Sequence, residues 1–434
     1  MAVSDAQLPL NDPLPHARLI AAPATGGSIK ERPEDFLVDE LPLYEPCGEG
    51  EHLYLRVQKR NVAHNELMSI LQQHYKVGEA AIGFAGMKDK VGVTQQTVSI
   101  HLPDREKARA DTDVPTHSRL QFLWTARHAN KLRRGHLVGN RFLIRIRKVD
   151  PLKAPAVHRQ LTSLLRTGVP DYYGFQRFGY RRNNHRLGLH VLRGEWTALL
   201  DELLGLRGSA SPSHQRERRE FYDAGQYAES APLWTRNDRA ERVAIGVLRR
   251  GAAHREAVLA IGRTTLSFWV SALQSYIFNE VLDRRINAGL LDQLLEGDLA
   301  WKHDSRRCFP IDAAELANPE LGDRLQAFEI SPSGPLPGSG MLTPGGEALR
   351  NETEVMAANG LAPELFEQGP FATTGSRRPL RVQITNLEVD SGFDEHGPYI
   401  RVAFDLPRGA YATVVLREAI GAGADCFAKD DGGV

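Results

Sequence analysis

Residues 83–97 combine charged side chains and glycines in a pattern that indicates chemistry. The segment reads Gly-Phe-Ala-Gly-Met-Lys-Asp-Lys-Val-Gly-Val-Thr-Gln-Gln-Thr, so that one carboxylate, Asp89, stands between Lys88 and Lys90. The three glycines allow tight turns and a close approach to a ligand. The flanking ammonium groups favour the ionised carboxylate and attract a polyanion. The pattern predicts either a carboxylate that acts as nucleophile or base on a nucleic acid, or an ordinary solvated turn.

Five further segments accompany this loop. They are KERPEDFLVDE at residues 30–40, GNRFLIR at 139–145, GVPDYYGFQRFG at 168–179, LQSYIFN at 273–279 and FDLPRGAYATVVLRE at 404–418. The Asp89 loop fits the pattern Ala-Gly-x-Lys-Asp-(Arg/Lys). Together the six blocks resemble, in the same order, the motifs of the tRNA pseudouridine synthase D family. They span about residues 29–420, nearly the whole chain.

The resemblance implies an RNA-modifying isomerase that converts uridine to pseudouridine in tRNA, at position thirteen of the D-arm. The reaction breaks an N-glycosidic bond, turns the base and rejoins it through carbon, so it needs no redox change and no phosphate donor. The resemblance therefore implies base flipping and a catalytic aspartate, without a cofactor or a metal. Asp89 matches that aspartate. Three roles are open for it: nucleophile at the ribose C1′, nucleophile at the uracil C6, or base at the ribose C2′.

Other residues match family positions around the flipped base. Lys30 would neutralise Asp89 or the uracil oxygens, unless it is a surface lysine opposite its neighbouring glutamate. The predicted base pocket consists of Phe36, Asn140, Phe142 and Tyr411. In it the amide would hydrogen-bond the ribose or the catalytic loop, and the aromatic rings would stack on the base, unless they are ordinary core residues. Phenylalanine has no hydroxyl group, so another group must remove the C5 proton.

The charges are segregated although the formal net charge is zero. Residues 119–148 hold nine basic side chains and no acid, and residues 178–193 hold four arginines and no acid. Such segregation predicts an RNA-binding surface, or simply a solvated face. The residues expected to contact RNA are Lys88, Lys90, Arg133, Arg134, Arg145, Arg147, Arg177, Arg181 and Arg182.

The hydrophobic pattern predicts the elements that position these residues. Strands are expected near 53–57, 93–100, 142–147, 380–388 and 401–406, and helices over 65–75, 153–166 and 266–281. Residues 331–346, rich in proline and glycine, are expected to form a loop without regular structure. Strands at both ends and a helix-rich middle predict an α+β fold. The resemblance implies a mixed, largely antiparallel sheet flanked by helices, with an inserted second α+β domain. We expect a loose extension over 1–27, a discontinuous catalytic domain over 28–165 and 376–434, and the insertion over 166–375.

Several function classes are disfavoured by what the sequence lacks. Three cysteines far apart argue against a disulfide framework or a cysteine zinc site and fit a reducing cytoplasm. No apolar run reaches the length of a membrane span, and no secretory signal is recognisable. No metalloprotease, phosphate-binding or dinucleotide-binding motif is found. We expect tRNA as partner, neither membrane nor metal, and a monomer, as the family suggests. The main alternative is a non-catalytic protein that binds or remodels RNA on the same scaffold.

Overall fold

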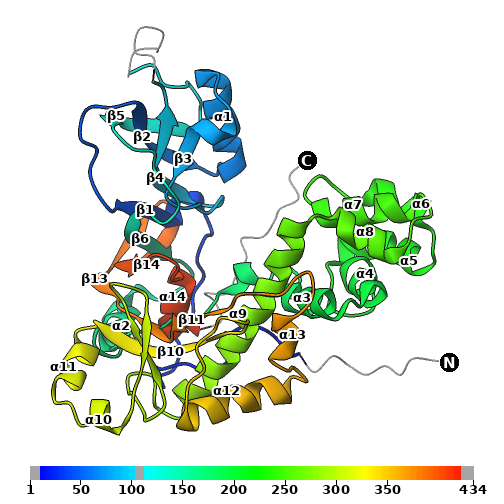
Figure 1. The fold of residues 1–434 in the computed structure, drawn as a ribbon. Coiled ribbons are helices and arrows are strands. Elements are labelled where there is room, and N and C mark those ends of the chain that lie inside the picture. The colour runs from blue at the N-terminus through cyan, green and yellow to red at the C-terminus, as the bar shows by residue number, and fades with distance from the viewer. Residues whose placement is uncertain (1–9, 104–111, 422–434) are drawn as a thin grey trace. The chain divides into compact units, whose positions relative to one another are not determined.

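The computed structural model describes residues 10–103 and 112–421. Its contacts divide the chain into two compact units, coloured along the chain in Figure 1. The inserted unit comprises Met1–Leu19 and Pro170–Arg381, and the sheet unit comprises Ile20–Val169 and Val382–Val434. The chain passes between them within two short strands, β7 (Val169–Pro170) and β12 (Arg381–Val382). These points lie a few residues after the boundaries expected from the sequence.

The sheet unit is built on an eight-stranded sheet in the order β13-β14-β6-β1-β4-β2-β5, with β3 paired to β4. In chain order its strands are β1 (Phe36–Pro42), β2 (His52–Arg60), β3 (Ile82–Phe84), β4 (Val93–His101), β5 (Leu120–His128), β6 (Leu137–Ile146), β13 (Thr385–Asp394) and β14 (Gly397–Pro407). Only the β1–β4 pair is parallel among the described residues. The expected mixed, largely antiparallel sheet is therefore confirmed.

Alternation of side chains fixes the orientation of these strands. On β6, Phe142, Ile144 and Ile146 are buried, as the sequence pattern predicts. Helix α1 (His64–Tyr75) buries Leu67 and Leu71 in the core beneath β2 and β4. The other α-helices of this unit are α2 (Ala154–Thr167) and α14 (Ala412–Ile420). Helices α1 and α2 were predicted, and each begins within one residue of the expected position.

One glycine allows two central strands to approach closely. A Cβ atom on Gly139 of β6 would lie 2.1 Å from the carbonyl oxygen of Leu406 on β14. Any larger residue would force the two strands apart, because a backbone carbonyl cannot move aside independently. The glycine that opens the 139–145 motif thus has a packing reason.

The inserted unit surrounds one long helix, α9 (Arg263–Asn287), which packs against α3 (Asn184–Arg193). Its other helices are α4 (Trp196–Leu204), α5 (Arg216–Asp223), α6 (Tyr227–Ser230), α7 (Arg239–Leu248), α8 (His254–Ala260), α10 (Ala313–Leu316), α11 (Glu320–Gln326), α12 (Gly346–Ala358) and α13 (Glu364–Glu367). A four-stranded sheet, in the order β11-β10-β8-β9, consists of β8 (Leu299–Lys302), β9 (Cys308–Pro310), β10 (Ile330–Leu336) and β11 (Ser376–Pro379). No helix of the described part is long and apolar enough to cross a membrane.

Two segments differ from the sequence expectations. The expected loop over 331–346 begins with strand β10. Residues 330–332 pair with β8 and residues 333–336 pair with β11. Pro332 has no N–H to donate, but its carbonyl oxygen accepts the N–H of Leu380, so the proline still takes part in the sheet. Residues 10–27 are not loose throughout: Leu10, Leu14 and Ala17 are buried. Residues 1–9 of the expected extension lie outside the described residues.

Candidate active site

Asp89 lies in the loop between β3 and β4, within the sheet unit. One of its carboxylate oxygens is 3.0 Å from the ammonium nitrogen of Lys30, and its side chain is 34% exposed. Lys30 itself is buried, with a left-handed backbone conformation at φ 59°. The predicted catalytic acid is thus ion-paired on one side and reachable by solvent on another.

A row of aromatic rings supports this ion pair. The Lys30 ammonium lies 4.1 Å from the centroid of the Phe36 ring, within cation–π range. The Phe36 and Phe142 rings are 6.3 Å apart, and the Phe142 and Phe404 rings 5.6 Å apart. All three rings are buried, and they come from the neighbouring strands β1, β6 and β14. In this structure they pack against one another, and stacking of Phe36 or Phe142 on a base stays a prediction.

Lys88 fastens the loop to the sheet. Its ammonium lies 2.6 Å from the amide oxygen of Asn140 and 2.9 Å from a carboxylate oxygen of Glu40. Those two residues face each other across the β1–β6 pair, and Glu40 also accepts the backbone N–H of Thr97 on β4. Lys88 is 8% exposed, and its ammonium contacts acceptors inside the protein. The sequence had instead predicted that it contacts RNA. The amide oxygen of Asn140 thus accepts from a lysine of the loop that carries Asp89, and a part for Asn140 in the base pocket stays a prediction.

Lys59 supports the same loop from beneath. Its ammonium donates to the carbonyl oxygens of Val62 and Asp89, both at 2.7 Å, and lies 3.4 Å from that of Lys88. Burial lowers the pKa of Lys59 to about 8, although the nearby Asp89 carboxylate acts in the opposite direction. A buried cation therefore holds the backbone of the candidate catalytic residue itself.

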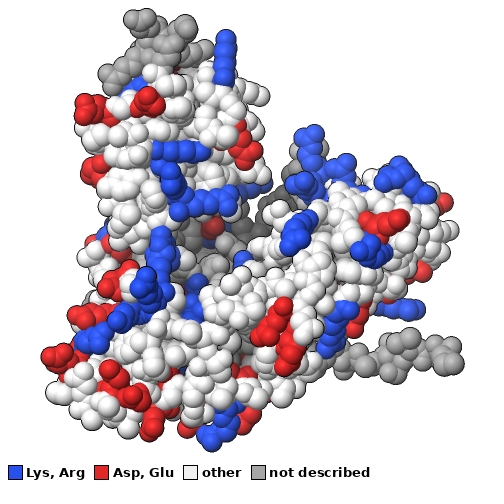
Figure 2. All heavy atoms as spheres, viewed as in Figure 1, with Lys and Arg blue, Asp and Glu red and all other residues white. Residues whose placement is uncertain are grey.

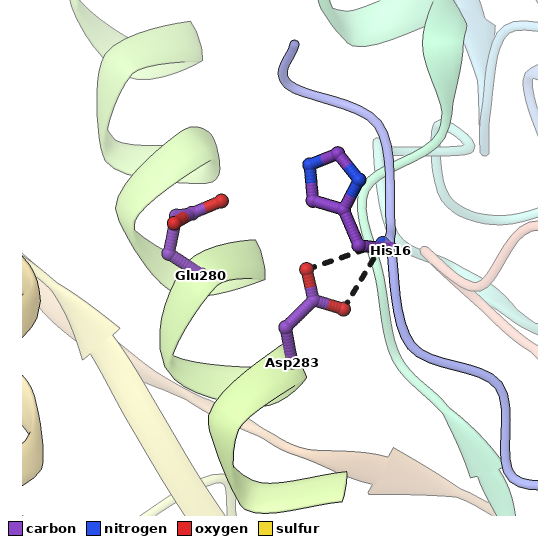
Figure 3. A group of neighbouring side chains, drawn as sticks. All are labelled: His16, Glu280 and Asp283. Atoms are coloured by element: carbon purple, nitrogen blue, oxygen red, sulfur yellow. Dashed lines mark hydrogen bonds between the residues drawn. The ribbon is translucent and has the colours of Figure 1, made fainter. Parts of the chain in front are cut away.

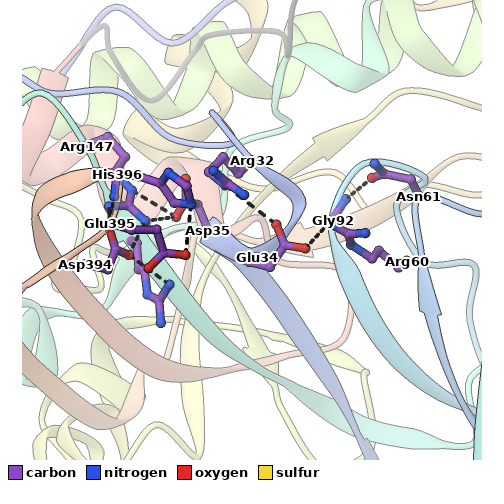
Figure 4. A network of polar contacts seen from close by, with 11 residues as sticks. Arg32, Glu34, Asp35, Arg60, Asn61, Gly92, Arg147, Asp394, Glu395 and His396 are labelled. Atoms are coloured by element: carbon purple, nitrogen blue, oxygen red, sulfur yellow. Dashed lines mark hydrogen bonds and ion pairs between the residues drawn. The ribbon is translucent and has the colours of Figure 1, made fainter. Parts of the chain in front are cut away.

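The loop ends at a glycine that the sheet requires. The N–H of Gly92 donates to the side chain of Asn61, and the N–H of Asn61 donates to the carbonyl of Gly92, both at 3.1 Å (Figure 4). Gly92 has a φ of 132°, and a Cβ atom there would lie 2.6 Å from the carbonyl oxygen of Phe36. The C-terminal end of the loop is thereby attached to the residue that follows β2.

Arg147 occupies the other half of the network in Figure 4. Its guanidinium binds the buried Asp35 at 2.6 Å and Asp394 at 2.7 Å, and it holds the pKa of Asp394 well below its usual range. The neighbouring Arg145 also reaches Asp394, at 3.3 Å. These two arginines, expected to contact RNA, thus have carboxylate partners within the sheet unit.

The remaining predicted RNA contacts fall into two groups. In the sheet unit, Lys90, Arg133 and Arg134 are exposed, and Figure 2 shows Lys and Arg side chains crossing the face of this unit that is in view. In the inserted unit, Arg181 is buried and donates to three backbone carbonyls between residues 202 and 209. A buried guanidinium group needs hydrogen-bond acceptors inside the protein, and these carbonyls provide them. Arg181 therefore does not act as a surface cation in this structure.

Three more predicted residues have local contacts. Arg177 binds the side chains of Ser271 and Ser275, and Arg182 pairs with Asp12 at 3.2 Å. Tyr411 is the half-buried residue that directly precedes α14. The structure therefore brings together the acid, the lysine at 30, the amide at 140 and both phenylalanines, all in the sheet unit.

Nearly the whole chain matches one family of known proteins. The family model described as tRNA pseudouridine synthase D (TruD) matches residues 16–419. The chain belongs to this family.

Two relatives within the family cover almost the full length. The tRNA pseudouridine synthase D of Geobacter sulfurreducens is 40% identical over 401 residues, which cover 92% of this chain and 95% of that protein. The one from Geobacter metallireducens is 39% identical over 403 residues, covering 92% and 96%. A solved structure from Methanosarcina mazei, described by the same family name, has 24% identity and a TM-score of 0.76 and covers 96% of this chain and 98% of that one. It has the same fold. As a tRNA pseudouridine synthase D family member, the protein is an isomerase that converts uridine to pseudouridine in tRNA.

Sequence reasoning did not single out Lys59 or Glu40 as members of this site. A signal for the first exists: Lys59 continues the buried face of β2 formed by Leu53, Leu55 and Val57. A lysine in phase with buried leucines predicts an internal acceptor. Glu40 carries the same signal, because it continues the buried face of β1 formed by Phe36 and Val38, although its partner Lys88 is distant in the sequence.

The inserted unit contains a group of three side chains of the types that can ligate a metal ion. The ligand atoms of His16, Glu280 and Asp283 lie within 4.8 Å of one another (Figure 3). The Asp283 carboxylate, however, accepts the backbone N–H groups of His16 and Ala17 and the hydroxyl of Tyr172. It is an anchor for residues 16 and 17, and the expectation of no metal stays a prediction. The residues are too far apart in sequence for a spacing motif to reveal the group.

Proposed function

We propose that Asp89 is the catalytic carboxylate of this isomerase, and that its substrate is the uridine at position thirteen in the D-arm of tRNA. The observation that carries the first part is the 3.0 Å contact between Lys30 and a half-exposed Asp89, on a loop held by two further lysines. The family membership supports the second part. We expect the protein to act as a monomer in the cytoplasm.

The chemistry requires that the uridine leave its stack. Extrusion costs a few kcal/mol, and stacking on protein aromatic rings returns roughly 1–3 kcal/mol per base. The bond between C1′ and N1 then breaks, the uracil turns, and a bond forms between C1′ and C5. The C5 proton leaves and N1 gains a proton, so the product is an isomer of the substrate. Asp89 can begin this sequence as a nucleophile at C1′ or C6, or as a base at C2′.

Each neighbour has a distinct part in this proposal. Lys30 orients the Asp89 carboxylate and presents a cation to the uracil oxygens. Lys88 and Asn140 hold the loop against the sheet at 2.6 Å and leave Lys90 exposed toward solvent. Exposed cations such as Arg133 and Arg134 contact phosphates, and binding should therefore weaken as salt rises. Since Phe142 cannot accept the C5 proton, another group must.

The decisive experiment compares wild-type protein with Asp89→Asn on unmodified tRNA, with pseudouridine mapped by carbodiimide treatment and primer extension. We expect the wild type to modify position thirteen, and the variant to form no product while binding tRNA within a few-fold of wild type. A transcript with cytidine at position thirteen is the substrate control. Turnover by Asp89→Asn would refute the catalytic assignment, and wild-type product at another site only would refute the target. Binding without turnover by wild type on any tRNA would favour the non-catalytic alternative.

A further inference from the structure

The inserted unit contains a pocket to which no function is yet attached. It has a volume of about 280 Å³ and lies between α3, α7 and α9. Its lining includes Tyr180, Asn184, Arg239, Glu241 and Phe268. The volume is at the lower end of small-molecule sites, which suits a single ring system and not a larger cofactor.

Two exposed aromatic rings border the pocket. Tyr180 is 46% exposed and Phe268 is 40% exposed. The Arg177 guanidinium lies 5.0 Å from the centroid of the Phe268 ring, within the range of a cation–π interaction. Exposed aromatic rings in a polar and cationic setting are typical of stacking platforms for bases.

The polar side chains of the pocket offer both signs of charge. Glu241 is 8% exposed and lines the pocket. Arg239 is exposed and forms no ion pair within the described residues. One buried carboxyl group and two exposed rings line the same pocket, and a cation lies at the surface, which matches a base whose N–H edge points inward and whose phosphate points outward.

We propose that this pocket binds one unpaired guanine of the RNA substrate, stacked on Phe268 or Tyr180, with its N–H edge at Glu241 and its phosphate at Arg239. The inference rests on the proposed function, since it assumes an RNA substrate. Guanine is favoured because its adjacent N1–H and N2–H₂ donors match the two oxygens of one carboxylate. Uracil offers one N–H between two carbonyl oxygens, which a carboxylate repels. The pocket thus adds a second base-recognition site in a unit that lacks Asp89.

The first test uses nucleotides alone. GMP, AMP, CMP and UMP are titrated into the full-length wild type, Phe268→Ala, Glu241→Gln and Phe393→Ala, with binding followed by ligand-observed NMR. Phe393 is a matched control, because it is an exposed phenylalanine of the sheet unit. We expect GMP to bind most tightly to the wild type and to the control, Phe268→Ala to lose binding, and Glu241→Gln to lose the preference for GMP. Equal binding of all four nucleotides, or none, would overturn the guanine assignment.

The second test uses tRNA and separates this inference from the proposed function. Loss of one stacked base is worth roughly 1–3 kcal/mol, so Phe268→Ala should weaken tRNA binding by about 5- to 150-fold. At saturating tRNA its turnover should remain close to that of the wild type, whereas Asp89→Asn should show the reverse. Unchanged affinity of a folded Phe268→Ala would refute the pocket alone. If Phe268→Ala binds tRNA more weakly than the wild type but the wild type never forms pseudouridine, the pocket stands and the proposed function is refuted.

Discussion

Three lysines contact different parts of the loop that carries Asp89, the proposed catalytic residue. Lys30 binds the carboxylate of Asp89, Lys59 binds its backbone carbonyl, and Lys88 binds side chains on β1 and β6. Each contact restricts a different freedom of the loop: the carboxylate orientation, the backbone position and the distance from the sheet. An acid that must meet a ribose or uracil carbon benefits from all three, since a shift of about 1 Å can reduce a rate 100-fold.

The contact at Lys59 leads to a prediction about rate. Lys59→Met keeps much of the side-chain volume and removes the donor to the two loop carbonyls. We expect kcat to fall by about 10- to 100-fold, by loss of positioning, with a much smaller change in KM. Steady-state kinetics on tRNA test this, with Lys76→Met as the control because Lys76 is exposed at the end of α1. A change confined to KM would show that Lys59 serves binding.

The pKa of about 8 for Lys59 also predicts a pH effect with opposite signs for rate and stability. As pH rises through 8, Lys59 loses its proton, its hydrogen bonds to the loop weaken, and the wild-type rate should fall. Between pH 8 and the ordinary pKa of 10.5, the unfolded chain binds this proton and the folded chain does not. Because the unfolded chain binds more protons, the contribution of Lys59 makes the free energy of unfolding increase as pH rises through that window. Single-turnover rates and urea unfolding from pH 6.5 to 9.5 test both signs. The Lys59→Met variant should lack both pH-dependent changes near pH 8. If the wild type and Lys59→Met gave the same pH profiles, the pKa assignment would be wrong.

At this scale the sequence predicts identities better than surroundings. Asp89, Lys30 and Asn140 follow from the motifs, because motifs record residues that chemistry requires in a given order. Partners distant in sequence are not recorded: Arg147 binds Asp394, which is 247 positions away, and so its charge was read as a surface charge. Counting charges shows neither burial nor neutralisation.

At the scale of elements, one arginine joins three parts of the sheet unit. Arg147 follows β6, Asp35 lies in the short helix η1 (Pro33–Asp35) before β1, and Asp394 ends β13. Lys30 and Phe36 lie close to η1 in sequence, so this ion cluster also fixes the start of the motif that contacts Asp89.

Removal of that arginine should therefore be costly. Arg147→Met leaves the fully buried Asp35 without its cation, which we expect to lower the free energy of unfolding by about 3–5 kcal/mol. The neighbouring Lys148 is exposed and pairs with Glu31, so Lys148→Met should change it by less than about 1 kcal/mol. Urea unfolding followed by circular dichroism compares the two. Equal effects would show that the cluster contributes nothing beyond a surface pair.

The elements that the sequence predicted best are those with strong periodicity, such as α1 and β6. Strand β10 was missed because its prolines and glycine indicate a loop when read locally. A Cβ atom on Gly334 would lie 2.9 Å from the Phe278 ring of α9, so this strand needs a residue without a side chain. Tertiary packing against α9 thus favours a strand here, although the local sequence favours a loop.

On the scale of the whole molecule, the chain contributes twice to each unit. Residues 10–19 belong to the inserted unit, although nearly all of that unit comes from residues 170–381. Their contacts with α9 are specific: Asn279 donates to the carbonyl of Pro13, and Asp283 accepts the N–H groups of His16 and Ala17. A segment that composition marked as loose is held by buried polar groups that need it.

The last prediction concerns this segment. Replacing residues 10–19 with a Gly/Ser sequence of equal length removes two buried leucines, each worth roughly 1.5–3 kcal/mol. It also leaves Asn279 and Asp283 with fewer partners in a buried setting, which adds to the loss. We expect the inserted unit to be destabilised by about 3–6 kcal/mol, visible as faster amide hydrogen exchange in α9 and α3. Asp12→Ala is the control, because that exposed carboxylate forms a surface pair with Arg182 and accepts one local N–H, that of Leu14, so its loss should leave exchange nearly unchanged. Unaltered protection of α9 in the replaced chain would mean that residues 170–381 hold this helix without the N-terminal segment.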